Sequence, residues 1–473
     1  MSNTLFRDEL RVVNVGVATF HDDLERQDVR AVQVNWSPPR SYPPEIHAAL
    51  AVLRRPDNAA RIAAANQLAV ERIVNSHPVL VGFGQALEVV PGMTKTTILH
   101  AGPPIAFQDM CGAMRGAVTG AIVFEGLAAD VEEAAVLAAS GGVTLAPNHQ
   151  HDCVGSMSGV TSASMYMQIV RNKTYGNVSY TNLAEQLARI LSMGANDQTV
   201  IDRLVWMRDV LGPMLAEAMQ FAEEIDLREL LAQALQMGDE SHNRNIAGTA
   251  LLFQKLAPLL LQTHFTTEQK KQVFDFIDAG TYFSGPTWMA LCKNAMDAAH
   301  GIPDSTIVTT MCRNGVEFGV RVSAFDGFRW FTGPAQKING PMMAGYTEAD
   351  AGLDIGDSAI TETYGIGGFA MAASPAIVPL VGGTVDDAMN CSHDMLEITT
   401  TTNPHITIPV LNFRGIATGI DVVKVIETGT LPIINTAMAH KDPGVGMIGA
   451  GFVNPPMEVF EKAIVELATR FGQ

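Results

Sequence analysis

The alternation of hydrophobic and polar positions changes period along the chain, and these changes divide it into segments. Residues 11–39 form an apolar run, a polar helix-compatible stretch and a second apolar run that prolines close. This pattern predicts a strand–helix–strand unit. Helical periodicity follows over residues 45–55 and 57–76. Residues 1–94 are therefore predicted to form an N-terminal α/β domain.

Short apolar runs return in residues 95–181, which we predict to be the first part of a second α/β domain. Residues 143–148 and 164–170 have the length and composition of strands. Between them lies PNHQHDCVGSMSG, residues 147–159, which is polar and rich in glycine. This stretch is predicted to be a loop.

A helical segment is predicted for residues 182–300. Helix starts are indicated by the spacing of Asn182 with Glu185 and of Asp226 with Glu229, and helix ends by Gly194 and Gly238. Gly212 and Pro213 are expected to break one long helical pattern in this segment.

The last segment, residues 301–473, is predicted to be the second part of the α/β domain. Residues 305–331 are rich in β-branched and aromatic side chains, with Asn314-Gly315 and Asp326-Gly327 as turns, which predicts hairpins. A glycine-rich apolar stretch follows, and residues 456–471 have the pattern of a closing helix. The expected fold is a multi-domain, mixed α/β fold with a helical middle segment and a glycine-rich C-terminal α/β region.

Composition excludes several classes of protein. The chain has 473 residues, 47% of them hydrophobic, which suits a globular protein with two or three domains. It has no apolar run of about 18 residues, so no membrane span is predicted, and its first residues do not resemble a secretory signal. A net charge of −18 without basic clusters argues against nucleic-acid binding. Five scattered cysteines without a CxxC pair favour the reducing cytoplasm.

The loop at residues 147–159 is the first candidate for chemistry. His149 and His151 flank Gln150, which places both on one side if the segment is extended. With Asp152 they are donor types that zinc or manganese binds, but the sequence offers no second cluster, so no metal is predicted. An acid/base role fits better, because histidine titrates near neutrality. The alternative is that both side chains only bond to neighbouring backbone.

Four further polar loops are candidates for binding a small anion. Residues 236–245 combine acidic, basic and guanidinium groups, and if a helix starts at Asp239 then Asp239 and Asn243 share one face. Arg313 suits planar anions, and the glycine-rich stretch after Asp354 can offer backbone amides. Each loop also has a plain structural explanation as a cap or turn. The candidate substrate-binding residues are Asp239, Glu240, His242, Asn243, Arg313, Asn314, Thr361, Thr363, Gly367, Gly368 and His440.

The chain resembles the YlbE/YahG-like family of bacterial proteins. The resemblance is carried by HAGPPI, PNHQHDCVGSMSG, QMGDESHNRN, RNGVEFGVRV, DIGDSAITETYGIGGFAMAASPA and INTAMAHKDPGVGMIGAG, in this order. It covers nearly the whole chain. Members occur beside FdrA-like proteins, which resemble acyl-CoA synthetases, and beside carbamate kinases. One branch is implicated as a subunit of oxamate carbamoyltransferase in anaerobic allantoin breakdown.

This resemblance implies a carbamoyltransferase subunit that exchanges an oxamate-type N-carbamoyl compound and phosphate for the free amide and carbamoyl phosphate. On that basis His149, His151 and Arg313 would stabilise the tetrahedral oxyanion and phosphate, and Glu317 or Glu362 would act as the general base. The candidate catalytic residues are His149, His151, Glu317 and Glu362. The implied partners are an FdrA-like subunit, further copies of this chain, and carbamate kinase as the next enzyme in the pathway. No cofactor is expected.

Two departures leave the substrate open. The phosphate-binding S-T-R-T sequence of aspartate and ornithine carbamoyltransferases is absent, so carbamoyl transfer would use an unrelated site. Ser156 stands where the family's loop is more often rich in proline, and the chain is closer to the YahG branch than to the oxamate branch. A second hypothesis is a non-catalytic scaffold or ligand-binding subunit that docks an FdrA-like partner. Convergence of the five loops on one cleft would favour catalysis.

Overall fold

The computed structural model describes residues 10–15, 18–34, 41–186 and 189–472, which form two units, residues 1–47 and 48–473. In the first unit, strands β1 (Arg11–Val15) and β2 (Arg30–Val34) pair in parallel, with helix α1 (Ala18–Glu25) between them in the chain. This confirms the predicted strand–helix–strand unit. The division of the chain at residues 94, 181 and 300 stays a prediction.

The larger unit contains a five-stranded sheet in the order β6-β8-β7-β3-β9. Its strands are β3 (Pro78–Gln85), β6 (Cys153–Val154), β7 (Tyr166–Asn172), β8 (Val178–Asn182) and β9 (Ile225–Asp226). The long strands β3, β7 and β8 pair antiparallel, and β6 joins β8 in parallel. The loop with the two histidines therefore leads directly into an edge of this sheet.

A second sheet holds the predicted hairpin, in the order β12-β11-β10-β13. Its strands are β10 (Val308–Asn314), β11 (Glu317–Val322), β12 (Phe331–Pro334) and β13 (Ile355–Gly356). Gly315 has a φ of +82°, a conformation that glycine adopts without strain, so the Asn-Gly turn forms as expected. Three further pairs are β4 (Thr97–His100) with β5 (Thr144–Pro147), β14 (Thr399–Ile408) with β15 (Arg414–Ile420), and β16 (Ile434–Ala439) with β17 (Met447–Val453).

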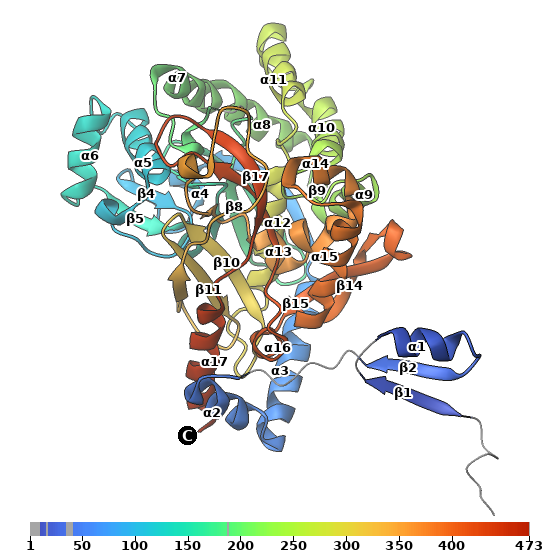
Figure 1. The fold of residues 1–473 in the computed structure, drawn as a ribbon. Helices are drawn as coiled ribbons and strands as arrows, with labels where there is room; N and C mark the ends of the chain where they lie inside the picture. The colour runs from blue at the N-terminus through green and yellow to red at the C-terminus, as the bar shows by residue number, and fades with distance from the viewer. Residues whose placement is uncertain (1–9, 16–17, 35–40, 187–188, 473) are drawn as a thin grey trace, which may run out of the picture. The chain divides into compact units, whose positions relative to one another are not determined.

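Helices cover these sheets and dominate the middle of the chain (Figure 1). The early helices are α2 (Pro44–Leu53), α3 (Pro56–Asn75), α4 (Ala86–Val89), α5 (Gly112–Phe124) and α6 (Val131–Ala139). The middle helices are α7 (Gln198–Trp206), α8 (Gly212–Ala218), α9 (Leu227–Gln236), α10 (Ile246–Leu260), α11 (Thr267–Ala279) and α12 (Gly285–Asp297). The late helices are α13 (Ile360–Tyr364), α14 (Val378–Val381), α15 (Val385–Ile398), α16 (Val422–Thr428) and α17 (Met457–Phe471). The mixed α/β fold, the helical middle and the closing helix are as predicted.

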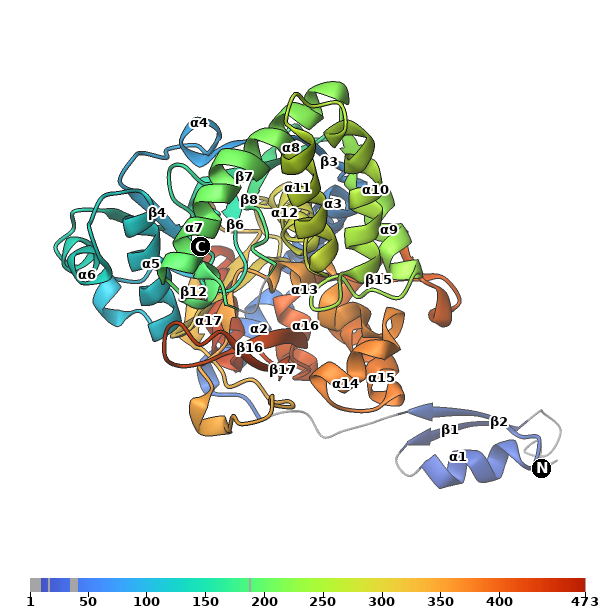
Figure 2. The same ribbon diagram turned by 90° about the horizontal axis from the view of Figure 1, so that it is seen from above.

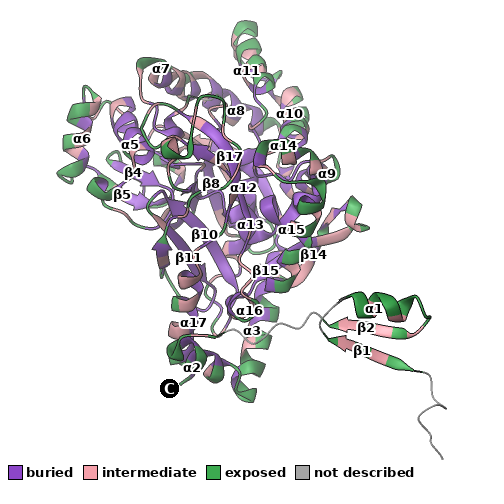
Figure 3. Ribbon diagram, in the orientation of Figure 1, coloured by how far each residue is buried: buried purple, intermediate pink, exposed green. Residues whose placement is uncertain are grey.

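Helix α12 is the central element of the larger unit. It packs against β7 and β8 of the first sheet, β10 of the second and helix α13, and Figure 2 shows it surrounded by other elements. Residues 285–296 are all buried, so it presents no solvent-facing stripe. A helix that is enclosed on all sides is expected to be apolar all round. The exceptions, Thr287, Lys293 and Asn294, are therefore buried polar groups that need partners. Figure 3 shows α12 with β10 and β11 in the buried interior.

Three local predictions for the middle segment were wrong. Gly212-Pro213 does not break the helix, because a π-helical turn, Met207–Leu211, joins α7 to α8 and proline occupies the first turn of α8. Asn182 caps no helix, since β8 ends there. No helix begins at Asp239, because α10 starts only at Ile246. Asp226 does cap α9, accepting a hydrogen bond from the Glu229 N–H. No helix in the described ranges is long and apolar enough to cross a membrane.

Candidate active site

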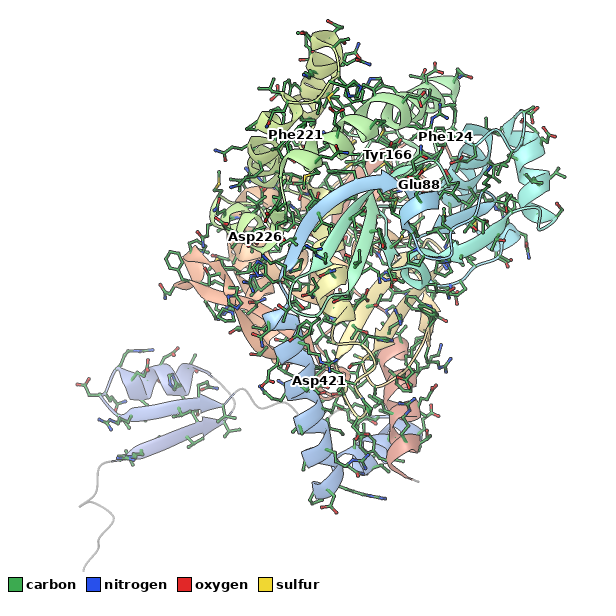
Figure 4. All side chains as sticks on the ribbon, turned by 180° about the vertical axis from the view of Figure 1, so that it is seen from behind. Glu88, Phe124, Tyr166, Phe221, Asp226 and Asp421 are labelled. Carbon is green, nitrogen blue, oxygen red and sulfur yellow. The ribbon has the colours of Figure 1, made fainter. Side chains whose placement is uncertain are left out.

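A cavity of about 350 Å³ lies in the larger unit, lined by residues from the middle helices and from strand β16. Most of its lining is apolar, and Figure 4 labels two of its aromatic side chains, Phe124 and Tyr166. A volume of this order suits an organic ligand. Its side chains with hydrogen-bonding groups include Ser156, His242, Asn243, Tyr282, Ser358 and Thr436. These polar groups are the best candidates for chemistry.

His242 is the imidazole among them, and a buried carboxylate orients it. Its Nδ1 lies 2.8 Å from Glu362 Oε1, and both side chains are almost fully buried. An ionised carboxylate only accepts, so this contact assigns the proton to Nδ1 and leaves Nε2 as the basic nitrogen. Glu362 is itself held, because the Gly368 N–H and the Thr361 hydroxyl donate to its two oxygens. A histidine fixed in this way can move a proton to or from a ligand in the cavity.

Glu240 shapes the loop that carries His242. Its carboxylate accepts hydrogen bonds from the backbone N–H groups of His242, Asn243 and Arg244. Burial raises the pKa of Glu240 to about 6, against these bonds, which lower it. Asp239 accepts from Arg244 and from the Gly248 N–H, so it ties the same loop to α10. Both acidic residues face inward and shape the loop around His242.

Two glycines in the stretch after α13 are required by this arrangement. Gly367 has a φ of +63°, and a Cβ there would lie 2.1 Å from Glu362 Oε1. Its N–H donates to the Glu240 carbonyl, while the Gly368 N–H donates to Glu362. The amides that were expected to bind an anion therefore hold a carboxylate and a carbonyl of the protein itself. A side chain at Gly367 would separate Glu362 from His242.

Arg313 lies fully buried behind two hydroxyls of the cavity. Its Nε and Nη2 donate to both oxygens of Asp354, at 2.6 and 2.7 Å. Nη1 donates to the Gly356 carbonyl and, at 3.3 Å, to Ser358 Oγ, while Nη2 donates to Thr436 Oγ1 at 3.0 Å. Since both hydroxyl oxygens accept from the guanidinium, their own protons stay free to donate. The guanidinium thus prepares two hydroxyl donors without touching a ligand.

Further donors lie beside these hydroxyls. The amide Nδ2 of Asn243 is buried and has no acceptor among the described residues. The Ser156 hydroxyl lies 3.4 Å from that of Tyr282. A buried donor without a partner is costly, and a ligand with oxygen atoms would satisfy it. Around His242 the cavity therefore offers several neutral donors beside one histidine, an arrangement that suits an anionic or strongly polarised oxygen, while Glu185 and Arg208 are the charged side chains elsewhere in its lining.

His149 does not line the cavity and lies instead beside Asp357. Its Nε2 is 3.5 Å from Asp357 Oδ1, and its Nδ1 is 3.4 Å from the ammonium of Lys293. Burial, together with Lys293 and Arg321, lowers the pKa of His149 well below its usual range. Asp357 accepts from the N–H groups of Gly102 and Gly155 and from Asn148, so it joins the histidine loop to β13.

Three side chains here also offer metal-ligand atoms. Atoms of His149, Cys312 and Asp357 lie within 4.8 Å of one another. A metal-bound imidazole normally donates its second N–H to a carboxylate or carbonyl. Here the second nitrogen faces the Lys293 ammonium, which cannot accept a hydrogen bond. This neighbour disfavours a cation at His149.

The remaining predicted residues lie outside the cavity lining. His151 is in the same 3₁₀ turn as His149, Asn148–His151, and bonds to the Pro91 carbonyl, so the two rings are not side by side on an extended segment. Asn314 donates to the Pro103 carbonyl, and Thr363 to that of Ala359. Glu317 is half-buried at the start of β11, opposite Pro334. His440 accepts from the Asp442 N–H and contacts the ring of Tyr346.

Buried titratable groups predict how stability depends on pH. Burial lowers the pKa of His100 from 6.5 to about 4, so between these values only the unfolded chain binds the proton, and unfolding becomes easier as the pH falls. Glu240 acts in the opposite direction below about pH 6, because its pKa is raised in the fold. We expect His100→Gln to weaken the acid-induced loss of stability and Glu240→Gln to strengthen it. Urea unfolding between about pH 7 and pH 4.5 measures how the free energy of unfolding of each variant depends on pH. If both substitutions change this dependence in the same direction, the opposite effects assigned to His100 and Glu240 are wrong.

Comparisons with known proteins agree with one another. A family model described as oxamate carbamoyltransferase subunit AllG matches residues 143–358. Escherichia coli YahG, an uncharacterized protein, is 63% identical over 472 residues and all of both chains. The Escherichia coli oxamate carbamoyltransferase subunit AllG is 42% identical over 87% of this chain and 99% of its own. A crystal structure of a conserved protein of unknown function from Enterococcus faecalis V583 shares 64% identity, with a TM-score of 0.86 over 86% of this chain and 98% of that one.

Proposed function

The chain belongs to the family of YahG and the oxamate carbamoyltransferase subunit AllG, and from this membership we propose that it is the catalytic subunit of a carbamoyltransferase. The reaction is reversible transfer of a carbamoyl group between an N-carbamoyl compound and phosphate, giving carbamoyl phosphate. The observation that carries the proposal is the His242–Glu362 pair beside three or more neutral donors in one cavity. A subunit that only bound or docked a partner would not need an oriented basic nitrogen there.

One histidine can serve both proton transfers of this reaction. A phosphate oxygen attacks the carbamoyl carbon, and the new C–O bond forms as the carbonyl oxygen takes negative charge. The C–N bond then breaks, and the leaving nitrogen takes a proton. Hydrogen phosphate loses one proton and the amide gains one, so the reaction balances without any oxidant or metal. His242 Nε2 accepts the first proton and delivers it to nitrogen, while Glu362 stabilises the imidazolium formed in between.

The hydroxyls of Ser358 and Thr436, which accept hydrogen bonds from Arg313, can donate to the negative charge that develops on the carbonyl oxygen. Donors that are fixed before reaction stabilise such an oxyanion without reorganisation. Ser358 and Thr436 each accept from Arg313 and have a proton to donate. The unpartnered amide of Asn243 is a third donor. His149, which was expected to take this role, supports it instead through Asp357, the residue before Ser358.

A partner subunit is part of the proposal. AllG is by name a subunit of a larger enzyme, so we infer that this chain also works beside other subunits. An FdrA-like chain is the partner we expect, together with further copies of this chain, in the cytoplasm. Carbamate kinase would consume the carbamoyl phosphate.

An assay of phosphate-dependent carbamoyl transfer tests the proposal. Purified chain, with and without an FdrA-like partner, is supplied with phosphate and one N-carbamoyl compound at a time, and carbamoyl phosphate is trapped by ADP and carbamate kinase as ATP. We expect ATP to form only when chain, phosphate and N-carbamoyl compound are all present. If ATP forms with the partner alone, the chain is a scaffold.

A further inference from the structure

The cavity is larger and more apolar than an oxamate-type substrate requires. N-carbamoyl-oxamate is small and polar at every atom, so it would leave most of this lining without a matching group. The cavity is in the size range of organic ligands with substantial apolar parts. We propose that the N-carbamoyl substrate of this chain carries an apolar substituent, aliphatic or aromatic, on the carbon beside its nitrogen. This inference rests on the proposed function for the position of the carbamoyl group.

Methionines form much of the apolar wall. The lining methionines are Met157, Met165, Met193, Met207 and Met447. Methionine has three rotatable bonds and a polarizable sulfur, and it is typical of surfaces that adapt to apolar groups of different shape. Leu191 and Leu204 extend the same wall. The wall therefore suits a family of apolar substituents better than one rigid group.

The backbone of this wall is unusual in the same place. Met207 and Arg208 belong to the π-helical turn Met207–Leu211, a feature that is frequent at functional sites. Directly after it, a Cβ at Gly212 would lie 2.2 Å from the ring of Tyr166, which also lines the cavity. Arg208 in turn stacks over Phe124, at 5.6 Å from the ring centre. These contacts position two aromatic rings and a cation around the apolar part of the cavity.

Electrostatics assign the two ends of the substrate. The donors Asn243, Ser358 and Thr436 and the base His242 serve the carbamoyl group and phosphate, where charge develops. The methionine and leucine side chains of the wall carry no hydrogen-bond donor, so the surface that they present favours burial of carbon. A substituent of leucine or phenylalanine size would gain about 1.5–3 kcal/mol from full burial, or roughly 10- to 150-fold in affinity. The expected substrates are thus N-carbamoyl derivatives of apolar amino acids or of similar amides.

Binding measurements test this without any need for turnover. Isothermal titration of the full chain with N-carbamoylglycine, N-carbamoyl-leucine and N-carbamoyl-phenylalanine compares ligands that differ only in the substituent. We expect Kd to fall by about 10-fold or more from the first to the other two. Met193→Gln, which keeps the length of the side chain, is expected to remove most of that difference. Met343→Gln, at an exposed methionine, is the matched control and should leave it unchanged.

A second variant fills the space instead. Ala437, beside Thr436, lines the cavity, so Ala437→Leu is expected to weaken the binding of N-carbamoyl-phenylalanine more than the binding of N-carbamoylglycine. Ala64→Leu, on the exposed face of α3, is its control. Equal affinities across the three ligands in the wild-type chain overturn the inference. Tighter binding of the two apolar ligands without any carbamoyl transfer would support the apolar-substituent inference and refute the proposed function. Carbamoyl transfer from N-carbamoyl-oxamate with equal affinities for the three ligands would support the proposed function and refute the inference.

Discussion

His242→Asn is expected to lower the turnover of carbamoyl transfer by about 10²–10⁴-fold, the usual contribution of a general acid/base. The change removes Nε2, the nitrogen that the contact with Glu362 leaves free to accept a proton. Binding of the N-carbamoyl compound should change little, because the hydroxyls of Ser358 and Thr436 stay in place. The measurement is kcat and KM of the coupled assay, with the loss expected in kcat.

Two companion variants make the result specific. Glu362→Gln keeps the shape of the side chain but removes the charge that stabilises the imidazolium, so it should also lower kcat, with His242→Asn adding little to it. His264→Asn is the matched control, since His264 is exposed and paired with Glu217. Wild-type kcat in His242→Asn would show that the proton passes through another group.

Local pattern predicted the elements of the fold well, because periodicity and turn chemistry are local. Residues 11–15 and 18–34 form the expected strands and helix, and the Asn314-Gly315 turn closes the expected hairpin. One failure occurred where a contact outside the predicted turn replaces the cap. Glu185, predicted as part of a helix cap, instead accepts hydrogen bonds from the N–H groups of Leu191 and Ser192.

The candidate site was only partly accessible from the sequence. Polar residues in apolar surroundings marked His242, Asn243 and Glu362, and these do lie together. The role of each depends on contacts across the fold, which no spacing encodes. Thr436 is 123 residues from Arg313, the guanidinium that bonds to it.

For other residues the sequence pattern indicated the wrong role or no role. The histidine pair at 149 and 151 stood out most in the sequence, yet one ring lies between Asp357 and the Lys293 ammonium and the other bonds to the Pro91 carbonyl. Tyr282 gave no signal at all, because a tyrosine before a helix is common. Whether a side chain in such a turn lines the cavity depends on its direction, which packing against the rest of the fold determines.

Arg313→Met is expected to destabilise the fold by about 3–5 kcal/mol, the cost of breaking a buried ion pair from one side. Asp354 would be left with its charge buried and without its bidentate partner. The Gly356 carbonyl, Ser358 and Thr436 would each lose a donor as well. Urea unfolding measures the loss. Arg329→Met, at an exposed ion pair with Glu466, is the control and should cost about 1 kcal/mol or less.

The double variant Arg313→Met/Asp354→Leu separates stability from function. Replacing both partners of a buried pair by apolar side chains is often close to neutral, so much of the lost stability should return. Carbamoyl transfer should not return, because nothing then polarises the Ser358 and Thr436 hydroxyls. We expect a folded variant whose kcat is lowered about 10²-fold or more, the effect of losing oxyanion donors. A double variant with both wild-type stability and wild-type kcat would mean that Arg313 serves only the fold, and that the oxyanion is bound elsewhere.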